Sequence, residues 1–234
     1  MYVVHGTCTL YDCQVATDRL SRATVAEHAL KLADREGVDS VTIRRLAQEL
    51  GVSPMALYWH FKNKDELLLG LADHALADVK ATRDAADPWL SQLRAMVEAL
   101  VEVMREHPSL HALLHVADKQ RSASFTRALN DALDLLTQGG FALDEAYWTS
   151  SYLLHGCIGL VEAQPGCPTT VSPEQAAEWR RQKRLSMEKL PPEEFAMVIA
   201  FARTVEEEPD LDRYYRFGID LLMAGVETAA TRAG

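Results

Sequence analysis

Apolar side chains recur along this chain with the period of an α-helix. The spacing i, i+3, i+4, i+7 places side chains on one helix face, and it first occurs between Ala26 and Ala33. The same spacing returns within residues 43–50, 68–79, 93–104, 125–136 and 195–202. Residues 2–11 are β-prone in composition, but a lone strand has nothing to pair with. The sequence therefore predicts an all-α fold of nine or ten helices.

Residues suited to helix ends divide this pattern into separate helices. Ser, Thr and Asn side chains accept hydrogen bonds from the free N–H groups at a helix start, and glycine adopts the left-handed conformation that often ends a helix. We expect helix starts at Ser21, Thr42, Ser53 and Asn63, and helix ends at Gly37, Gly51 and Gly139. The helix that starts at Asn63 is expected to continue to Arg83.

Composition places the chain among ordinary globular proteins. Its 234 residues are 48% apolar and 25% charged, which suffices for a buried core. The four cysteines contain no CxxC pair and are too few for a disulfide framework; they are Cys8, Cys13, Cys157 and Cys167. We find neither a signal peptide nor the ~20-residue apolar run of a membrane helix. We therefore expect a soluble cytoplasmic protein with no metal, no cofactor and no membrane partner.

Charge is distributed unevenly along the chain. The net charge is −10, yet residues 19–64 carry eight basic and five acidic side chains, while residues 65–234 have a net charge of −11. A basic front and an acidic back suggest two parts with different partners. We predict a first domain over residues 20–66 and a second over residues 67–234. Residues 1–19 are either a disordered arm or lie upstream of the natural start codon.

Two short helices joined by a tight turn stand out within residues 41–66. Helices of eight and about seven residues flank the turn at residues 51–53, and Leu57 and Phe61 occupy the inward positions i and i+4. This is the spacing of a helix-turn-helix, whose second helix fits the major groove of DNA. The outward positions are Met55, Ala56, Tyr58, Trp59 and His60, and the groups suited to phosphates are Thr42, Tyr58, Lys62 and Lys64. Core burial of Tyr58 and Trp59 is the competing interpretation.

Residues 21–83 resemble the TetR (tetracycline repressor-like) family of transcriptional regulators. The resemblance is carried by residues 41–47, 57–64 and 67–68, and it continues more loosely to about residue 230. It implies a three-helix helix-turn-helix domain followed by a helical ligand-binding and dimerisation domain of the tetracycline-repressor type. It also implies a homodimer that binds palindromic operator DNA and is released by a small-molecule inducer.

The resemblance implies roles for single residues as well. Thr42, Tyr58 and Lys64 would contact phosphates, and Arg44 would reach a guanine edge. Between Ser53 and Phe61 there is no Arg, Lys, Asn or Gln, so specificity must depend on Arg44, on His60 and on DNA shape. The expected DNA-binding residues are Thr42, Arg44, Ser53, Pro54, Met55, Ala56, Tyr58, Trp59, His60 and Lys64. The basic cluster at residues 180–184 is expected to be a solvated face.

The second domain contains two segments that are apolar almost all round, residues 144–163 and 211–226. A helix of that kind is buried on every face. The resemblance implies that the two helices pair with their copies across a two-fold axis, and the need to read two half-sites independently favours a dimer. The alternative is the core of a monomer.

A ligand pocket is expected between the helices of the second domain, because aromatic side chains with a few polar tips suit a drug-sized molecule. The candidate lining residues are Trp89, Met104, His107, His111, His115, Phe125, Trp148, Tyr152 and His155. The sequence around His115 and Glu162 departs from that of tetracycline repressors, so neither magnesium nor tetracycline is predicted. A ligand there would move the end of the helix that starts at Asn63 and change the separation of the two recognition helices.

Three classes of function compete for this chain. The leading hypothesis is a DNA-binding repressor without catalysis. The alternative is a small-molecule-binding or helical interaction protein whose helix-turn-helix is purely structural, and it predicts no salt-sensitive binding to a duplex. An enzyme is not expected, because the chain has no GxSxG, HExxH, P-loop or dinucleotide motif.

Overall fold

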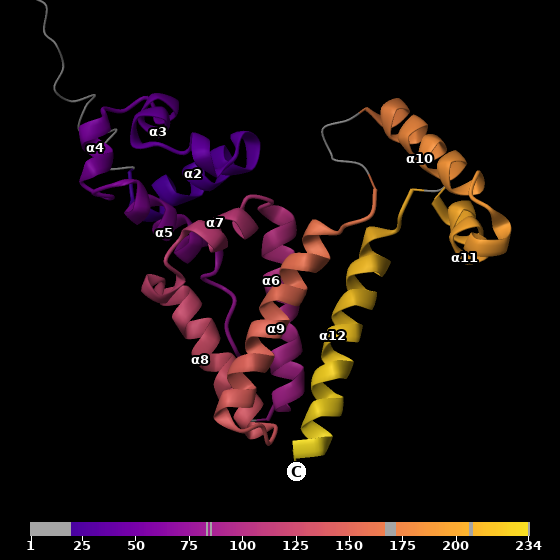
Figure 1. The fold of residues 1–234 in the computed structure, drawn as a ribbon. Coiled ribbons are helices and arrows are strands. Elements are labelled where there is room, and N and C mark those ends of the chain that lie inside the picture. Colours follow the sequence, from indigo (N-terminus) through magenta and orange to yellow (C-terminus); the bar gives the residue numbers. More distant parts are fainter. Residues whose placement is uncertain (1–19, 83, 85, 167–171, 206–207, 234) are drawn as a thin grey trace, which may run out of the picture. The chain divides into compact units, whose positions relative to one another are not determined.

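The computed structural model describes residues 20–233 apart from 83, 85, 167–171 and 206–207. The described residues contain eleven α-helices, three short 3-10 helices and no strand. This confirms the all-α prediction (Figure 1). The first helices are α2 (Arg22–Glu36), α3 (Ile43–Leu50), α4 (Pro54–Tyr58) and α5 (Lys64–Ala75). They are followed by α6 (Trp89–Glu106), α7 (Leu110–Val116), α8 (Ala123–Gln138), α9 (Leu143–Glu162), α10 (Pro173–Glu188), α11 (Pro192–Ala202) and α12 (Leu211–Ala233).

The chain forms two compact units. The first contains the described residues up to Ile158 together with the last turns of α12, and the second contains Gly159–Gly225. The helix-turn-helix and helices α6–α8 therefore belong to one unit, in which α5 packs against α2, α7 and α8. The predicted arm at residues 1–19, with Cys8 and Cys13, lies outside the described residues, and so does Cys167. No helix in the described part of the chain combines the length and apolarity that a bilayer span requires.

Side-chain caps begin the first four helices, as the sequence predicts. The N-cap hydroxyls of Ser21, Thr42 and Ser53 accept backbone N–H groups at 3.0, 3.1 and 3.3 Å. Asn63 Oδ1 accepts the backbone N–H of Glu66 at 2.8 Å. Gly51 ends α3 in the left-handed conformation, with φ 67° and ψ 27°. These caps satisfy donors and acceptors that a helix end leaves free, and they set the short turn between α3 and α4.

The helix that starts at Asn63 is shorter than predicted. It ends at Ala75 instead of continuing to Arg83. Local turn-type backbone hydrogen bonds follow at Ala77 and Val79. Tertiary hydrogen bonds take over beyond them: the backbone N–H of Ala81 donates to Asp131 at 3.1 Å, and Gln92 Nε2 donates to the carbonyls of Asp84 and Asp87, both at 3.0 Å. Buried polar contacts of this kind compete with continuation of a helix.

Candidate nucleic-acid interface and cavity

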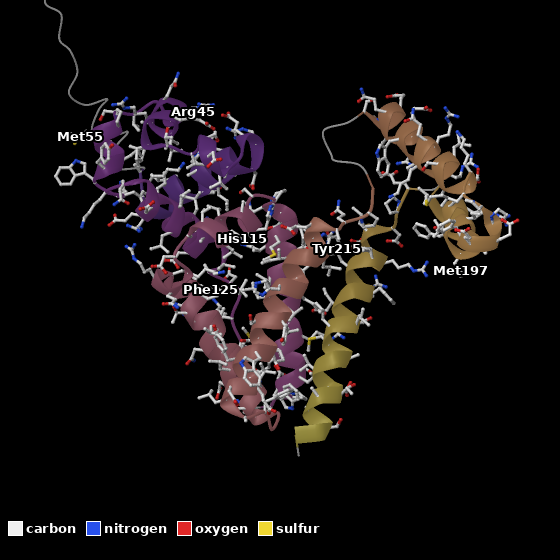
Figure 2. All side chains as sticks on the ribbon, viewed as in Figure 1. Arg45, Met55, His115, Phe125, Met197 and Tyr215 are labelled. Atoms are coloured by element: carbon white, nitrogen blue, oxygen red, sulfur yellow. The ribbon has the colours of Figure 1, made fainter. Side chains whose placement is uncertain are left out.

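Helix α4 separates an inward side from an outward one. Leu57 and Phe61 have no exposed surface, whereas Met55 is 66%, Tyr58 45% and Trp59 85% exposed. Figure 2 shows Met55 on the outer side of this helix. The competing interpretation of Tyr58 and Trp59 as core aromatics is therefore wrong. A group of large apolar side chains exposed on one helix is typical of a surface that binds a partner.

The end of α4 is held in place by α2 and α5. Arg22 Nη1 donates to the backbone carbonyl of His60 at 2.8 Å, and its guanidinium carbon lies 4.4 Å from the centre of the Phe61 ring. Gly70 of α5 has no Cβ, and a Cβ there would collide with the Phe61 ring. The end of α4 is thus fixed by contacts with both α2 and α5.

Two neighbouring arginines of α3 have different environments. Arg45 is paired with Glu36 at 2.7 Å and with Glu49 at 3.5 Å, and the hydrogen bond to Glu36 raises the pKa of its guanidinium. Arg44 is exposed and makes no hydrogen bond or ion pair within the described part of the chain. Arg44 is therefore available to a partner, whereas Arg45 is engaged within the protein.

Apart from Tyr58 of α4, the predicted phosphate-contact residues lie before and after this helix in the chain. Thr42 and Ser53 use their oxygens as helix caps, and their O–H groups remain donors. Lys64 Nζ donates to the backbone carbonyl of Asp39 at 3.3 Å. Lys62 is exposed, and its ammonium has no partner among the residues that the structure describes. Pro54 begins α4, and Ala56 and His60 are half-buried beside the exposed residues.

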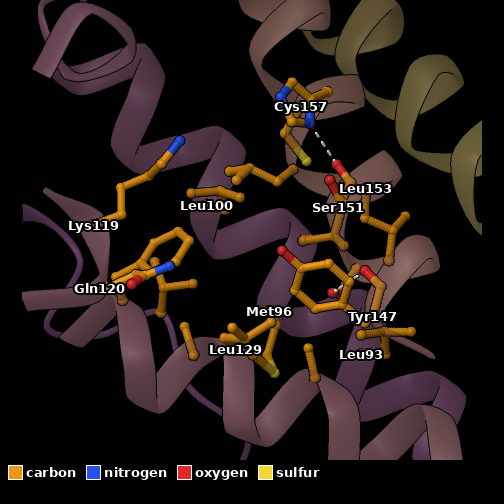
Figure 3. Close-up of a pocket in the computed structure, with 18 residues that line it drawn as sticks. Leu93, Met96, Leu100, Lys119, Gln120, Leu129, Tyr147, Ser151, Leu153 and Cys157 are labelled. Atoms are coloured by element: carbon orange, nitrogen blue, oxygen red, sulfur yellow. Dashed lines mark hydrogen bonds between the residues drawn. The ribbon is translucent and has the colours of Figure 1, made fainter. Parts of the chain in front are cut away.

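A cavity of about 350 Å³ lies within the first unit. Its walls come from α6, α8 and α9 and from the 3-10 helix at Lys119–Arg121 (Figure 3). Leu93, Met96, Val97 and Leu153 are buried along the walls. Cys157 is fully buried there as well, and this burial raises the pKa of its thiol to about 12. The volume lies in the range of small-molecule sites.

Two of the nine predicted ligand residues line this cavity, namely Phe125 and His155. Trp89 instead packs against Gly139, and His107 lies 2.8 Å from Asp34. Met104 is buried at 1% exposure outside the lining. The remaining four predicted residues also lie outside the lining, and they are His111, His115, Trp148 and Tyr152.

Several lining residues are absent from the sequence-based prediction. They include Lys119 and Gln120 from the 3-10 helix, and Tyr147 and Ser151 from α9. The spacing of Tyr147, Ser151 and His155 is i, i+4, i+8, which places them on one helix face. This spacing could have identified Tyr147 and Ser151 as companions of the predicted His155. Nothing in the local sequence marks the 3-10 helix as a wall of the cavity.

Asp34 connects the helix-turn-helix to the helices after it. Its carboxylate accepts the backbone N–H of Ser109 at 3.0 Å and the Ser109 hydroxyl at 2.7 Å, beside Nδ1 of His107 at 2.8 Å. Asp73 of α5 accepts the Ser122 hydroxyl at 2.5 Å and the Ser124 N–H at 2.9 Å in the same manner. Across the described ranges, no cluster of His, Cys, Asp or Glu side chains has an arrangement that could hold a metal ion.

The second unit joins the end of α9 to α12. The Tyr214 hydroxyl donates to the carbonyl of Leu160 at 3.0 Å, and Gly218 lies against the Leu160 side chain. Phe217 and Leu221 of α12 are nevertheless 68% and 65% exposed. The two apolar helices are therefore not buried on every face within one chain, which disfavours the alternative of a monomer core.

The basic cluster of α10 pairs with neighbouring groups. Arg181 forms an ion pair with Glu178 at 2.7 Å and Arg184 with Glu188 at 2.9 Å. Lys183 lies over the Trp179 ring at 4.8 Å. Arg181 and Lys183 are exposed, as expected for a solvated face, whereas Arg180 and Arg184 are half-buried.

Two family models match adjacent parts of the chain. Residues 26–71 match the model described as "Bacterial regulatory proteins, tetR family". Residues 82–230 match the model described as "Tetracyclin repressor-like, C-terminal domain". Together they cover the helix-turn-helix and most of the helices on its C-terminal side.

Individual proteins are similar over nearly the whole chain. The tetracycline repressor protein class D of Escherichia coli is 28% identical over 218 residues, which are 91% of this chain and 92% of that protein. The structure of apo ActR from Streptomyces coelicolor has a TM-score of 0.73 at 24% identity and covers 92% of this chain and 98% of its own. ActR in complex with actinorhodin has a TM-score of 0.72 at 25% identity, with coverages of 90% and 98%.

Proposed function

Because this chain belongs to the TetR family of bacterial regulatory proteins, we propose that it is a ligand-responsive repressor. It binds palindromic operator DNA as a homodimer and is released by a small-molecule inducer. The observation that carries the proposal is one compact unit that holds both the exposed side chains of α4 and a cavity of about 350 Å³.

In the proposed complex, α4 enters the major groove. Met55 and Trp59 supply apolar contacts, for which thymine methyl groups are suitable partners. Arg44 has no partner within the described residues, and its guanidinium can donate two hydrogen bonds to one guanine. Tyr58 and Lys64 hold the phosphate backbone, and such contacts set orientation without reading sequence.

The proposed inducer site is the cavity. A ligand changes DNA affinity only through its different affinities for the DNA-competent and DNA-incompetent shapes, and a coupling of about 1–3 kcal/mol corresponds to roughly 5–150-fold release. Helix α5 packs on α2 and also on α7 and α8. A shift of α8 caused by a ligand can therefore be transmitted through α5 to the helix-turn-helix. ActR, a TetR family protein of similar structure, has been crystallised in complex with actinorhodin, and this supports a small-molecule ligand for the present chain.

The test begins with fragments of genomic DNA selected by the purified protein. Affinity for a selected duplex is measured by fluorescence anisotropy at several salt concentrations, and it is expected to fall steeply as salt rises. Tyr58→Ala and Lys64→Ala should weaken binding to every site similarly. Arg44→Ala should relax the preference at one base pair by about 1–3 kcal/mol. Arg127→Ala is the matched control, because Arg127 is an exposed arginine on α8.

The alternative is a helical protein whose helix-turn-helix has only a structural role. It predicts no salt-sensitive duplex binding by the wild type. If Arg44→Ala, Tyr58→Ala and Lys64→Ala all bind as the wild type does, the proposed docking of α4 is wrong.

A further inference from the structure

We propose that the cavity takes an amphipathic organic acid, whose apolar body fills the interior and whose carboxylate pairs with Lys119. This inference rests on the proposed function, because it names the chemical class of the inducer. Three properties of the lining support it: the apolar interior, the position of the polar groups and the sign of the charge.

The interior offers almost no hydrogen-bonding groups. Val79, Leu93, Met96, Val97 and Leu153 are each at most 6% exposed and line the cavity. A polar ligand group placed among them would lose its hydration without gaining a partner, which costs on the order of 2–7 kcal/mol. The part of the ligand that enters deepest is therefore apolar.

Polar lining groups lie on the more exposed part of the lining. Gln120, Tyr147 and His155 are exposed, and Lys119 and Ser151 are half-buried. In Figure 3, Lys119 and Gln120 lie on the opposite side of the cavity from Tyr147 and Ser151. His155 Nδ1 donates to the backbone carbonyl of Ser151 at 2.7 Å, which leaves its Nε2 for other partners. The polar end of a ligand would therefore remain at the opening.

The charge of the lining has one sign. None of the described residues that line the cavity is an aspartate or a glutamate, and Lys119 supplies a cation. Its ammonium makes no hydrogen bond or ion pair within the described part of the chain. The neighbouring Asp118 lines a separate hollow with Asp65 and Arg121. A half-buried cation without a counter-ion favours an anionic ligand and disfavours a cationic one.

Three probes of one shape test this preference. We would use 9-anthracenecarboxylate, 9-anthracenemethanol and protonated 9-anthracenemethylamine, which differ in charge on the same ring system. Binding to the DNA-free full chain is measured by calorimetry at neutral pH. The anion should bind at least about ten-fold more tightly than the cation, since a hydrogen bond to a charged group contributes that much.

Variants at Lys119 test whether this residue causes the preference for the anionic probe. Lys119→Gln should remove it, and Lys119→Glu should reverse it in favour of the cation. Arg121→Gln is the matched control, because Arg121 is a cation two residues away that lies outside the cavity lining, and it should keep the wild-type preference. Because Lys119 is half-buried, its substitutions could affect folding. Circular dichroism therefore checks that each variant is folded.

Equal affinity of the wild type for the three probes would overturn the inference, and so would an anion preference that persists in Lys119→Glu. The proposed function is judged separately, by duplex binding of the same preparation without any probe. A protein that binds operator DNA but shows no charge preference loses only the organic-acid inference. A protein with the preference but without duplex binding loses only the repressor proposal.

Discussion

Trp89 packs its indole ring against the end of α8. A Cβ atom at Gly139 would lie 2.7 Å from Cζ2 of Trp89, which is closer than carbon atoms approach. Gly139→Ala should therefore destabilise the fold by about 1–3 kcal/mol, as overpacking does, and urea denaturation would measure this. In a Trp89→Leu background the cost should shrink, because the clashing ring is gone. An unchanged cost in that background would show that the indole is not the cause.

Cys157 should be almost inert towards thiol reagents in the native state. Its pKa is raised to about 12 by burial, and the thiolate is the reactive form. A rise from 9.0 to about 12 leaves about 1,000-fold less thiolate at pH 8 than in an unfolded chain. The rate with an aromatic disulfide is measured in a variant in which Cys8, Cys13 and Cys167 are replaced by serine. Equal rates with and without urea would contradict the prediction.

The same pKa shift has a consequence for stability. Below pH 9 the Cys157 thiol keeps its proton in both states, and its contribution to stability is fully present. Between pH 9 and about 12 only the unfolded state loses the proton, so stability falls as the pH rises. Cys157→Ala should therefore show a shallower loss of stability between pH 9 and 10.5 than the wild type.

At the residue level, local contacts were predictable and distant ones were not. The caps at Ser21, Thr42 and Asn63 depend on residues three positions away, so the sequence contains both partners. The contact of His107 with Asp34 joins residues 73 positions apart, and no local pattern indicates it. For this reason His107 was expected in a ligand pocket, although its ring lies against Asp34.

Among the elements, α2 and α7 are joined through Asp34, whose carboxylate accepts the N–H and hydroxyl of Ser109, the residue that precedes α7. Asp34→Ala leaves the Ser109 N–H and hydroxyl without their acceptor. Ser109 is 8% exposed, and a buried donor without a partner costs about 1–3 kcal/mol. We expect a loss of stability of that size in urea denaturation. Glu27→Ala is the control: it removes an exposed ion pair with Lys31 and should change stability by less than about 1 kcal/mol.

Helix lengths could be predicted only where local residues end the helix. Gly51 ends α3 through its own left-handed conformation. Helix α5 ends at Ala75 without such a signal, and the residues after it are held by Asp131 and Gln92 of later helices. A pattern of apolar residues that continues past Ala75, with Val79 buried, therefore suggested a longer helix than the one that forms.

For the whole molecule, helical periodicity was sufficient to predict the fold class. It could not show which apolar helix faces are buried within one chain and which remain exposed. Trp148 and Tyr152 of α9 are 54% and 77% exposed. Phe217 and Leu221 of α12 are exposed as well. Sequence patterns record that a face is apolar and not what covers it. These exposed side chains are the part of the molecule for which the proposed homodimer accounts.

Charged substitutions on these helices should separate the dimer into monomers. Tyr152→Glu and Phe217→Glu place a carboxylate among apolar side chains that the partner copy would bury, and a buried unpaired charge costs several kcal/mol. Light scattering after size-exclusion chromatography should report a dimer for the wild type and a monomer for each variant, with unchanged helical content. Both variants should also lose most of their affinity for a palindromic duplex, because each monomer then holds only one half-site.

The control is Val116→Glu, which alters another exposed apolar residue, 62% exposed on α7, and should remain dimeric. A monomeric wild type, or dimeric variants at both positions, would reject the proposed interface and leave the exposed faces of α9 and α12 without an explanation.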